Sequence, residues 1–174
     1  PLAQIQVDEV VEELQRHHPN LVFSLERVSI PTRGDIDRET SLKNLDKTSF
    51  FTEEIDVALL TGQIRLGVHS AKDLPDPLPS GLKLICLTKG IDPSDSLVLR
   101  ERTSLADLPI GSRIGTSSFR REQAVLRLRP DFVITDIRGT IGARLELLHQ
   151  GTIDGLVVAE AALIRLQLTH LNRL

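Results

Sequence analysis

Residues 113–168 are RIGTSSFRREQAVLRLRPDFVITDIRGTIGARLELLHQGTIDGLVVAEAALIRLQL, in which short apolar segments alternate with longer amphipathic ones. We therefore predict three strands, each followed by a helix, at residues 113–116, 118–129, 132–137, 140–150, 155–159 and 161–168. Strands that are connected through helices favour a largely parallel sheet with both faces covered. The sequence thus predicts an α/β fold.

The first half of the chain shows a similar alternation. Apolar residues recur at helical spacing from Leu2 to Leu14, and Pro19 disfavours continuation of that helix. A second helix is predicted to begin at Thr52, a capping residue followed by two acids, and to end at Gly62. Strands are predicted at residues 21–26, 64–70 and 83–88.

The segment Lys89-Gly-Ile-Asp-Pro-Ser-Asp95 interrupts this alternation. We therefore expect two domains, residues 1–88 and 96–174, joined by a hinge at residues 89–95. Pro1 enters a helical pattern directly and Leu174 ends the chain without a tail, so we expect both ends to be cut.

Composition restricts the function classes. The chain has 174 residues and a net charge of −3, so no overall positive field attracts it to nucleic acid or to an anionic membrane. Five Phe are its only aromatic residues, which argues against a protein that stacks on bases. Its longest apolar stretches, such as residues 153–163, are interrupted by acids and too short to span a bilayer.

Cys86 is the only cysteine, so no intrachain disulfide is possible. It lies in the apolar segment 83–88, which predicts a buried strand and an inert, packed thiol. The absence of a disulfide framework fits a cytoplasmic protein.

Three strand-to-helix junctions in the second half carry arginine. They are Ile114-Gly-Thr-Ser-Ser-Phe-Arg-Arg121, Ile137-Arg-Gly-Thr-Ile-Gly-Ala-Arg144 and Val158-Ala-Glu-Ala-Ala-Leu-Ile-Arg165. Ligands of an open parallel sheet bind beyond the carboxyl ends of its strands, where helix N-termini offer unpaired N–H groups. Guanidinium groups there suit carboxylates or phosphates. A single Ser-Ser at a helix start is usually a cap and a single arginine usually a solvated side chain, but three such junctions favour a pocket for a polyanion.

The first half offers the segment Val68-His-Ser-Ala-Lys-Asp-Leu-Pro75, at the end of a predicted strand. Lys72 and Asp73 precede two closely spaced prolines, so this is a stiff loop in which a carboxylate can balance a developing cation or move a proton. The alternative is a Lys-Asp turn without chemistry, and His69 at the end of a strand is more often structural. Phosphate-binding loop, paired-cysteine metal and nucleophile-elbow motifs are missing from the sequence, so we expect no metal.

In order and spacing, these segments resemble the hydroxymethylbilane synthase (porphobilinogen deaminase) family over essentially the whole chain. The matching segments are Thr32–Asp35, Phe51–Leu60, Val68–Pro75, Asp92–Asp95, Gly115–Arg121, Arg129–Asp131, Ile137–Arg144 and Ala161–Leu166. The resemblance implies two domains like type II periplasmic binding proteins with a cleft between them, and a third domain that is absent here. It implies joining of four porphobilinogen molecules, with loss of ammonia, on a dipyrromethane cofactor whose attachment cysteine is not in this chain.

The resemblance also implies roles for individual residues. Asp73 is the expected catalytic carboxylate. The acetate and propionate groups of cofactor, growing chain and substrate are expected to be held by Lys72, Ser118, Arg120, Arg121, Arg138, Arg144 and Arg165. Porphobilinogen is the expected partner, with no nucleic acid and no membrane, and we expect a monomer.

Some positions depart from the family pattern. Lys43 and Lys47 lie one place from the usual lysines, and the glycines of that loop are missing. Ala71 replaces a methionine and Thr140 an asparagine, and the family's first strand is absent before Pro1. Two alternatives therefore stay open, a non-catalytic two-lobed module that binds a small dicarboxylate and a degenerate relative that retains the pocket.

Overall fold

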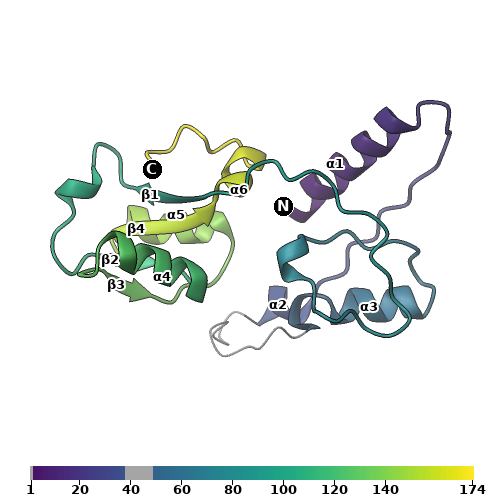
Figure 1. Ribbon diagram of the computed structural model, residues 1–174, viewed down its shortest axis with the longest axis horizontal. Coiled ribbons are helices and arrows are strands. Elements are labelled where there is room, and N and C mark those ends of the chain that lie inside the picture. Colours follow the sequence, from purple (N-terminus) through teal and green to yellow (C-terminus); the bar gives the residue numbers. More distant parts are fainter. Residues whose placement is uncertain (1, 38–48) are drawn as a thin grey trace. The chain divides into compact units, whose positions relative to one another are not determined.

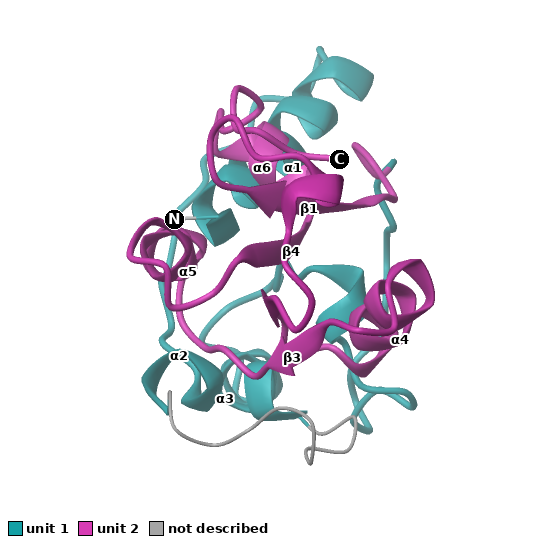
Figure 2. Ribbon diagram, turned by 90° about the vertical axis from the view of Figure 1, so that its left-hand side faces the viewer, with its two compact units in different colours: residues 1–38, 46–89 teal, residues 39–45, 90–174 magenta. Residues whose placement is uncertain are grey.

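The computed structural model describes residues 2–37 and 49–174 (Figure 1). They form two compact units, with residues 2–37 and 49–89 in unit 1 and residues 90–174 in unit 2 (Figure 2). The lysine loop with Lys43 and Lys47 lies outside the described residues.

Unit 2 contains a four-stranded sheet of order β1-β4-β2-β3. Its strands are β1 (Asp95–Leu99), β2 (Arg113–Gly115), β3 (Val133–Thr135) and β4 (Gly155–Ala159). β2 pairs in parallel with both β3 and β4, which confirms the predicted parallel part of the sheet. β1, which the sequence did not predict, pairs antiparallel with β4 so that Asp95 lies opposite Ala159.

Each parallel strand is followed by a helix, as predicted. The helices are α4 (Phe119–Leu128), α5 (Ile141–His149) and α6 (Glu160–Arg165). Thr140 caps α5 by accepting a hydrogen bond from the amide of Ala143, at 3.2 Å. Gly151, with φ of 74°, follows α5 in the left-handed conformation that commonly ends helices.

β1 and β4 are buried on both faces because their residues alternate between two apolar clusters. Leu156 and Val158 pack with residues of α5 and α6, whereas Val157 packs with Ile114 and with Val125 of α4. Figure 1 accordingly shows α4 and α5 on opposite sides of the sheet. Burial on both faces explains why near-continuous apolar runs identified β4 from sequence.

The C-terminal segment covers the outer edge of β1. Leu97 and Leu174 exchange two backbone hydrogen bonds of 2.8 and 3.1 Å, and the amide of Leu99 donates to Asn172 O at 2.9 Å. Arg173 forms an ion pair with Glu160 of α6, with 2.8 Å between Nη2 and Oε1. These contacts close an edge that would otherwise expose strand hydrogen-bonding groups.

Unit 1 is built from helices and irregular segments. Its elements are α1 (Leu2–His17), α2 (Arg33–Ile36), η2 (Ser49–Phe51), α3 (Glu53–Leu60) and η3 (Ala71–Asp73), of which η2 and η3 are 3₁₀ turns. The predicted helices at α1 and α3 are confirmed. Gly62, with φ of 73°, follows α3 as expected.

The three strands predicted in the first half are wrong. No strand occurs among the described residues of unit 1, and the segments at 21–26, 64–70 and 83–88 are irregular. A β-strand is stable only when a neighbouring strand satisfies its backbone groups, and alternation of side chains does not supply that neighbour. Val22, at 102% of its reference area, and Ile85, at 70%, are consequently exposed.

Cys86 is exposed as well, so the prediction of a buried thiol in a strand is also wrong. Thr32-Arg-Gly-Asp35 forms the start of α2, where the Asp35 carboxylate accepts hydrogen bonds from both the amide and the hydroxyl of Thr32, at 3.0 and 2.8 Å. This is a capping box, so Asp35 serves the local fold. Within the described residues, we find no helix with the length and apolar character needed to cross a membrane.

Candidate functional site

The topology of unit 2 brings the ends of β2, β3 and β4 to one edge of the sheet. Because the three strands are parallel neighbours, the loops after β2 and β3, at residues 116–118 and 136–140, begin at that edge, and α6 begins there directly after β4. This edge is where open α/β sheets bind their ligands. We call it the carboxyl edge of unit 2.

The loop between β2 and α4 is fixed by hydrogen bonds to β3 and the residues that follow it. The amide of Thr116, which is buried, donates to Thr135 O at 3.0 Å, and the Ser117 hydroxyl donates to Ile137 O. Ser118 is the N-cap of α4, and its carbonyl oxygen accepts from the amide of Glu122 at 2.9 Å. These bonds place Ser118 and the first turn of α4 at the carboxyl edge.

Three of the predicted arginines lie close enough to interact electrostatically. Burial lowers the pKa of the Arg144 guanidinium, the positive charges of Arg121 and Arg138 lower it further, and the carboxylate of Asp136 acts in the opposite direction. Arg144 Nε donates to Gly139 O at 2.9 Å, which fixes its side chain over the loop before α5. We call Arg121, Arg138 and Arg144 the arginine cluster.

Like charges that are held together and partly removed from water destabilise a fold unless an anion neutralises them. The arginine cluster therefore has the electrostatic character of a binding site for a polyanion. The planar forks of its guanidinium groups match carboxylates.

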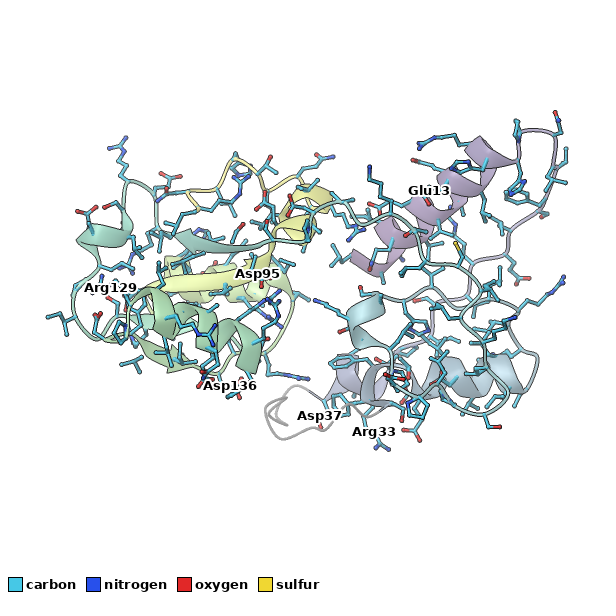
Figure 3. All side chains as sticks on the ribbon, in the orientation of Figure 1. Glu13, Arg33, Asp37, Asp95, Arg129 and Asp136 are labelled. Atoms are coloured by element: carbon cyan, nitrogen blue, oxygen red, sulfur yellow. The ribbon has the colours of Figure 1, made fainter. Side chains whose placement is uncertain are left out.

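Asp95 is a further member of the carboxyl edge that sequence reasoning missed. Its Oδ1 lies 2.8 Å from Arg121 Nη2, and its Oδ2 lies 2.7 Å from Arg120 Nη2. Burial raises the pKa of this carboxyl, but hydrogen bonds and charges of Arg121 and Arg120 outweigh burial and hold the pKa below its ordinary value. Figure 3 shows Asp95 where β1 begins, near α4.

Arg165 is the remaining predicted arginine. It is the last residue of α6, about 7.5 Å along the helix axis from Glu160, which begins α6 directly after β4. Arg120 and Arg121, by contrast, lie in the first turn of α4.

In unit 1, Lys72 and Asp73 lie in the turn η3 and are both exposed. The amide of Asp73 donates to Ser70 O at 2.9 Å, which closes the turn. Ser70 is tied to α1, because Gln6 Nε2 lies 3.0 Å from the Ser70 hydroxyl. The turn therefore presents both charged side chains to solvent from an anchored backbone.

His69 precedes this turn and is half-buried. Burial lowers its pKa, and the negative charges of Asp56 and Asp73 oppose that effect. Asp56 is itself buried and accepts a hydrogen bond from the Thr52 hydroxyl at 2.7 Å. His69 is therefore held mainly uncharged at neutral pH, beside the exposed carboxylate of Asp73.

Taken separately, the two units define a class of protein. Unit 2 is an α/β unit whose carboxyl edge gathers arginines suited to a small polycarboxylate, and unit 1 presents a carboxylate on an anchored turn.

Residues 1–173 match a family model described as porphobilinogen deaminase, dipyrromethane cofactor-binding domain. The chain therefore belongs to the porphobilinogen deaminase family, a family of transferases in tetrapyrrole biosynthesis. The match confirms the resemblance inferred from the motifs and dipyrromethane as the cofactor of this domain.

The residues present fit that cofactor. Dipyrromethane carries acetate and propionate groups, and the arginine cluster offers three cations, of which Arg144 has its charged state disfavoured by burial and by the charges of the other two. Carboxylates from the cofactor would relieve this repulsion.

Proposed function

We propose that this chain is the part of a hydroxymethylbilane synthase that holds substrate and cofactor, in a cytoplasmic, monomeric enzyme that joins four porphobilinogen molecules with loss of ammonia. In this proposal its two units correspond to two lobes like those of type II periplasmic binding proteins. The observation that carries the proposal is the arginine cluster at the carboxyl edge of unit 2.

Arginine side chains at this edge supply binding and orientation. Arg121, Arg138 and Arg144 would hold carboxylates of the cofactor and the growing chain, with Ser118, Arg120 and Arg165 at the same junctions. The cofactor, when bound, supplies the pyrrole carbon on which the chain grows. The guanidinium groups fix the pyrrole carboxylates by paired hydrogen bonds and so orient the reacting carbons.

Asp73 would serve the chemical step, with Lys72 binding a carboxylate beside it. When porphobilinogen loses ammonia, the bond between its aminomethyl carbon and nitrogen breaks and both electrons leave with nitrogen. Positive charge then spreads over the pyrrole ring of the substrate. A fixed carboxylate near the pyrrole nitrogen stabilises this charge and accepts a hydrogen bond from the ring N–H.

The test is the substitution Asp73→Ala in the full-length enzyme, with porphobilinogen consumption as the readout. We expect turnover to fall by at least about a hundredfold, the usual contribution of a positioned acid, base or charge, while the melting temperature stays unchanged because Asp73 is exposed. Asp76→Asn, which removes another exposed carboxylate three residues away, is the matched control. Full activity of the Asp73→Ala enzyme would refute the proposal.

A second candidate function is a non-catalytic module that binds a small dicarboxylate. It is favoured by Cys86, the only cysteine of the sequence, which lies in an irregular segment of unit 1. Mass spectrometry of the intact purified protein separates the two candidates. A covalent dipyrromethane adduct supports the enzyme, and an unmodified full-length protein that still binds carboxylates supports the module.

A further inference from the structure

The antiparallel pairing of β1 has a consequence for the carboxyl edge. Because β1 runs opposite to β4, its first residue, Asp95, lies beside Ala159, the last residue of β4. The polypeptide therefore delivers a carboxylate to the edge at which the parallel strands deliver arginines. This carboxylate comes from the segment that enters unit 2, far in sequence from α4.

Asp95 contacts its two arginine partners differently. One oxygen, Oδ1, accepts a hydrogen bond from Arg121 Nε at 3.0 Å and lies 2.8 Å from Arg121 Nη2. The other oxygen, Oδ2, lies 2.7 Å from Arg120 Nη2. The Arg121 and Asp95 side chains are 12% and 19% exposed, whereas the Arg120 side chain is 73% exposed.

The exposed fractions of the side chains indicate which of the two ion pairs of Asp95, with Arg121 or with Arg120, is the more stable. An exposed ion pair is weak because water competes for both partners, so Arg120 can exchange its partner easily. The pair with Arg121 is shielded, and Asp95 and Arg121 also line a cavity of about 160 Å³ whose other walls include Val125, Leu128 and Val157. Apolar surroundings strengthen the interaction between the two charges.

Arg121 is also a member of the arginine cluster, in which its charge acts on Arg144. Without a counter-charge, repulsion from Arg144 would favour rotamers of Arg121 that point away into solvent. Asp95 opposes this repulsion and limits the rotamers of Arg121.

We propose that Asp95 is a positioning residue that holds Arg121 in the anion-binding geometry of the carboxyl edge. This inference rests on the proposed function, because Arg121 must bind a carboxylate of substrate or growing chain for its position to matter. Asp95 does not touch the ligand in this proposal and acts only through Arg121.

The experiment is a double-mutant cycle in the full-length enzyme, with steady-state kinetics on porphobilinogen. We expect Asp95→Asn to raise KM about tenfold, the effect of losing one well-made charged contact, with kcat changed less than about twofold. Arg121→Gln should raise KM at least as much. The double variant should be no worse than Arg121→Gln alone, because Asp95 has no effect once Arg121 is missing.

Two further variants separate positioning from general stability. Asp95→Glu keeps the charge and should recover most of the lost affinity, and Glu101→Gln, which removes an exposed carboxylate six residues later, should leave KM unchanged. Melting temperatures are measured for every variant. If Asp95→Asn does not fold, or if Asp95→Glu is folded but no better than Asp95→Asn, Asp95 serves stability and the proposal is overturned.

The same cycle distinguishes failure of this inference from failure of the proposed function. If Arg121→Gln impairs binding and Asp95→Asn does not, or if their effects on KM multiply, only the positioning role is refuted. If Arg121→Gln itself leaves KM unchanged, Arg121 has no part in binding and both proposals lose their support at this residue.

Discussion

The arginine side chains of unit 2 differ in the groups with which they form hydrogen bonds and ion pairs. Arg129 donates to both oxygens of Asp131 and to the carbonyl oxygens of Leu105 and Leu108, and its guanidinium lies 4.5 Å from the centre of the Phe132 ring. These contacts join the 3₁₀ turn Leu105–Asp107 to the end of α4. Figure 3 shows Arg129 and Asp95 toward opposite ends of unit 2. Arg129 therefore maintains the fold, although it belongs to a motif shared with the family.

We expect Arg129→Ala to lower the free energy of unfolding by about 2 kcal/mol, since charged hydrogen bonds and a ring contact are lost from a mostly buried group. Urea denaturation of the chain measures this value. Arg127→Ala, at an exposed position of α4 two residues earlier, is the control and should change stability by less than about 0.5 kcal/mol. An unchanged unfolding midpoint for Arg129→Ala would show that these contacts do not contribute to the free energy of unfolding.

At the scale of elements, the C-terminal segment and α6 are joined through one carboxylate. Glu160 Oε2 accepts from the Ser96 hydroxyl at 2.5 Å and from Arg173 Nε at 2.9 Å, so β1, α6 and the C-terminal segment meet at this side chain. The hydrogen bonds from Arg173 and Ser96 hold the pKa of Glu160 below its ordinary value of 4.5. An ionised carboxyl therefore adds to the backbone hydrogen bonds that hold the C-terminal segment on β1.

The sign of the resulting pH dependence follows from this lowered pKa. The unfolded chain takes up the proton near pH 4.5 and the folded chain only at lower pH, so the contribution of Glu160 is fully present above pH 4.5. It is lost as pH falls through the lowered pKa. Urea unfolding between pH 7 and pH 3 should show wild type more stable than Glu160→Gln at neutral pH, with a difference that shrinks in acid. A difference independent of pH would contradict this account.

Some elements could be predicted from sequence and others could not, for physical reasons that are visible in particular residues. β2 and β4 were predictable because Ile114, Leu156 and Val158 are buried in a covered sheet, where apolar runs directly reflect strands. β1 was missed because the polar segment before Asp95 indicated only a break. The segments near Val22 and Ile85 have a strand-like pattern, but pairing depends on residues elsewhere that a local pattern does not contain.

The candidate site likewise contains residues that could be predicted from the sequence and one that could not. The arginines of the junctions were found from local motifs, because strand, loop and helix start follow one another in the chain. Asp95 was not found, because its position beside Arg121 follows only from the antiparallel direction of β1.

At the scale of the whole molecule, the two units differ in how far their backbone N–H and C=O groups are paired in hydrogen bonds. The segments at residues 22–28, 65–69 and 83–89 of unit 1 make no backbone–backbone hydrogen bond to other described residues, whereas the strands of unit 2 are paired throughout the sheet. Local opening is easiest where such bonds and buried apolar contacts are few.

We therefore expect hydrogen exchange of the chain to be fast in these three segments and slow in β1 and β4. Exchange followed by peptide mass spectrometry measures both in one sample. The amides of α1 and α3 in unit 1, which have helical partners, serve as an internal reference and should exchange at intermediate rates. Slow exchange across residues 83–89 would mean that this segment is protected in solution.

The exposed thiol of Cys86 has a practical consequence. Because it is the only sulfhydryl in the sequence and is open to solvent, a maleimide dye attaches to this chain at one known atom of unit 1 without any prior engineering. A second cysteine introduced at an exposed position of unit 2, such as Arg127, then completes a donor–acceptor pair. Energy transfer within that pair reports, in real time, any change in separation between the units as porphobilinogen is added.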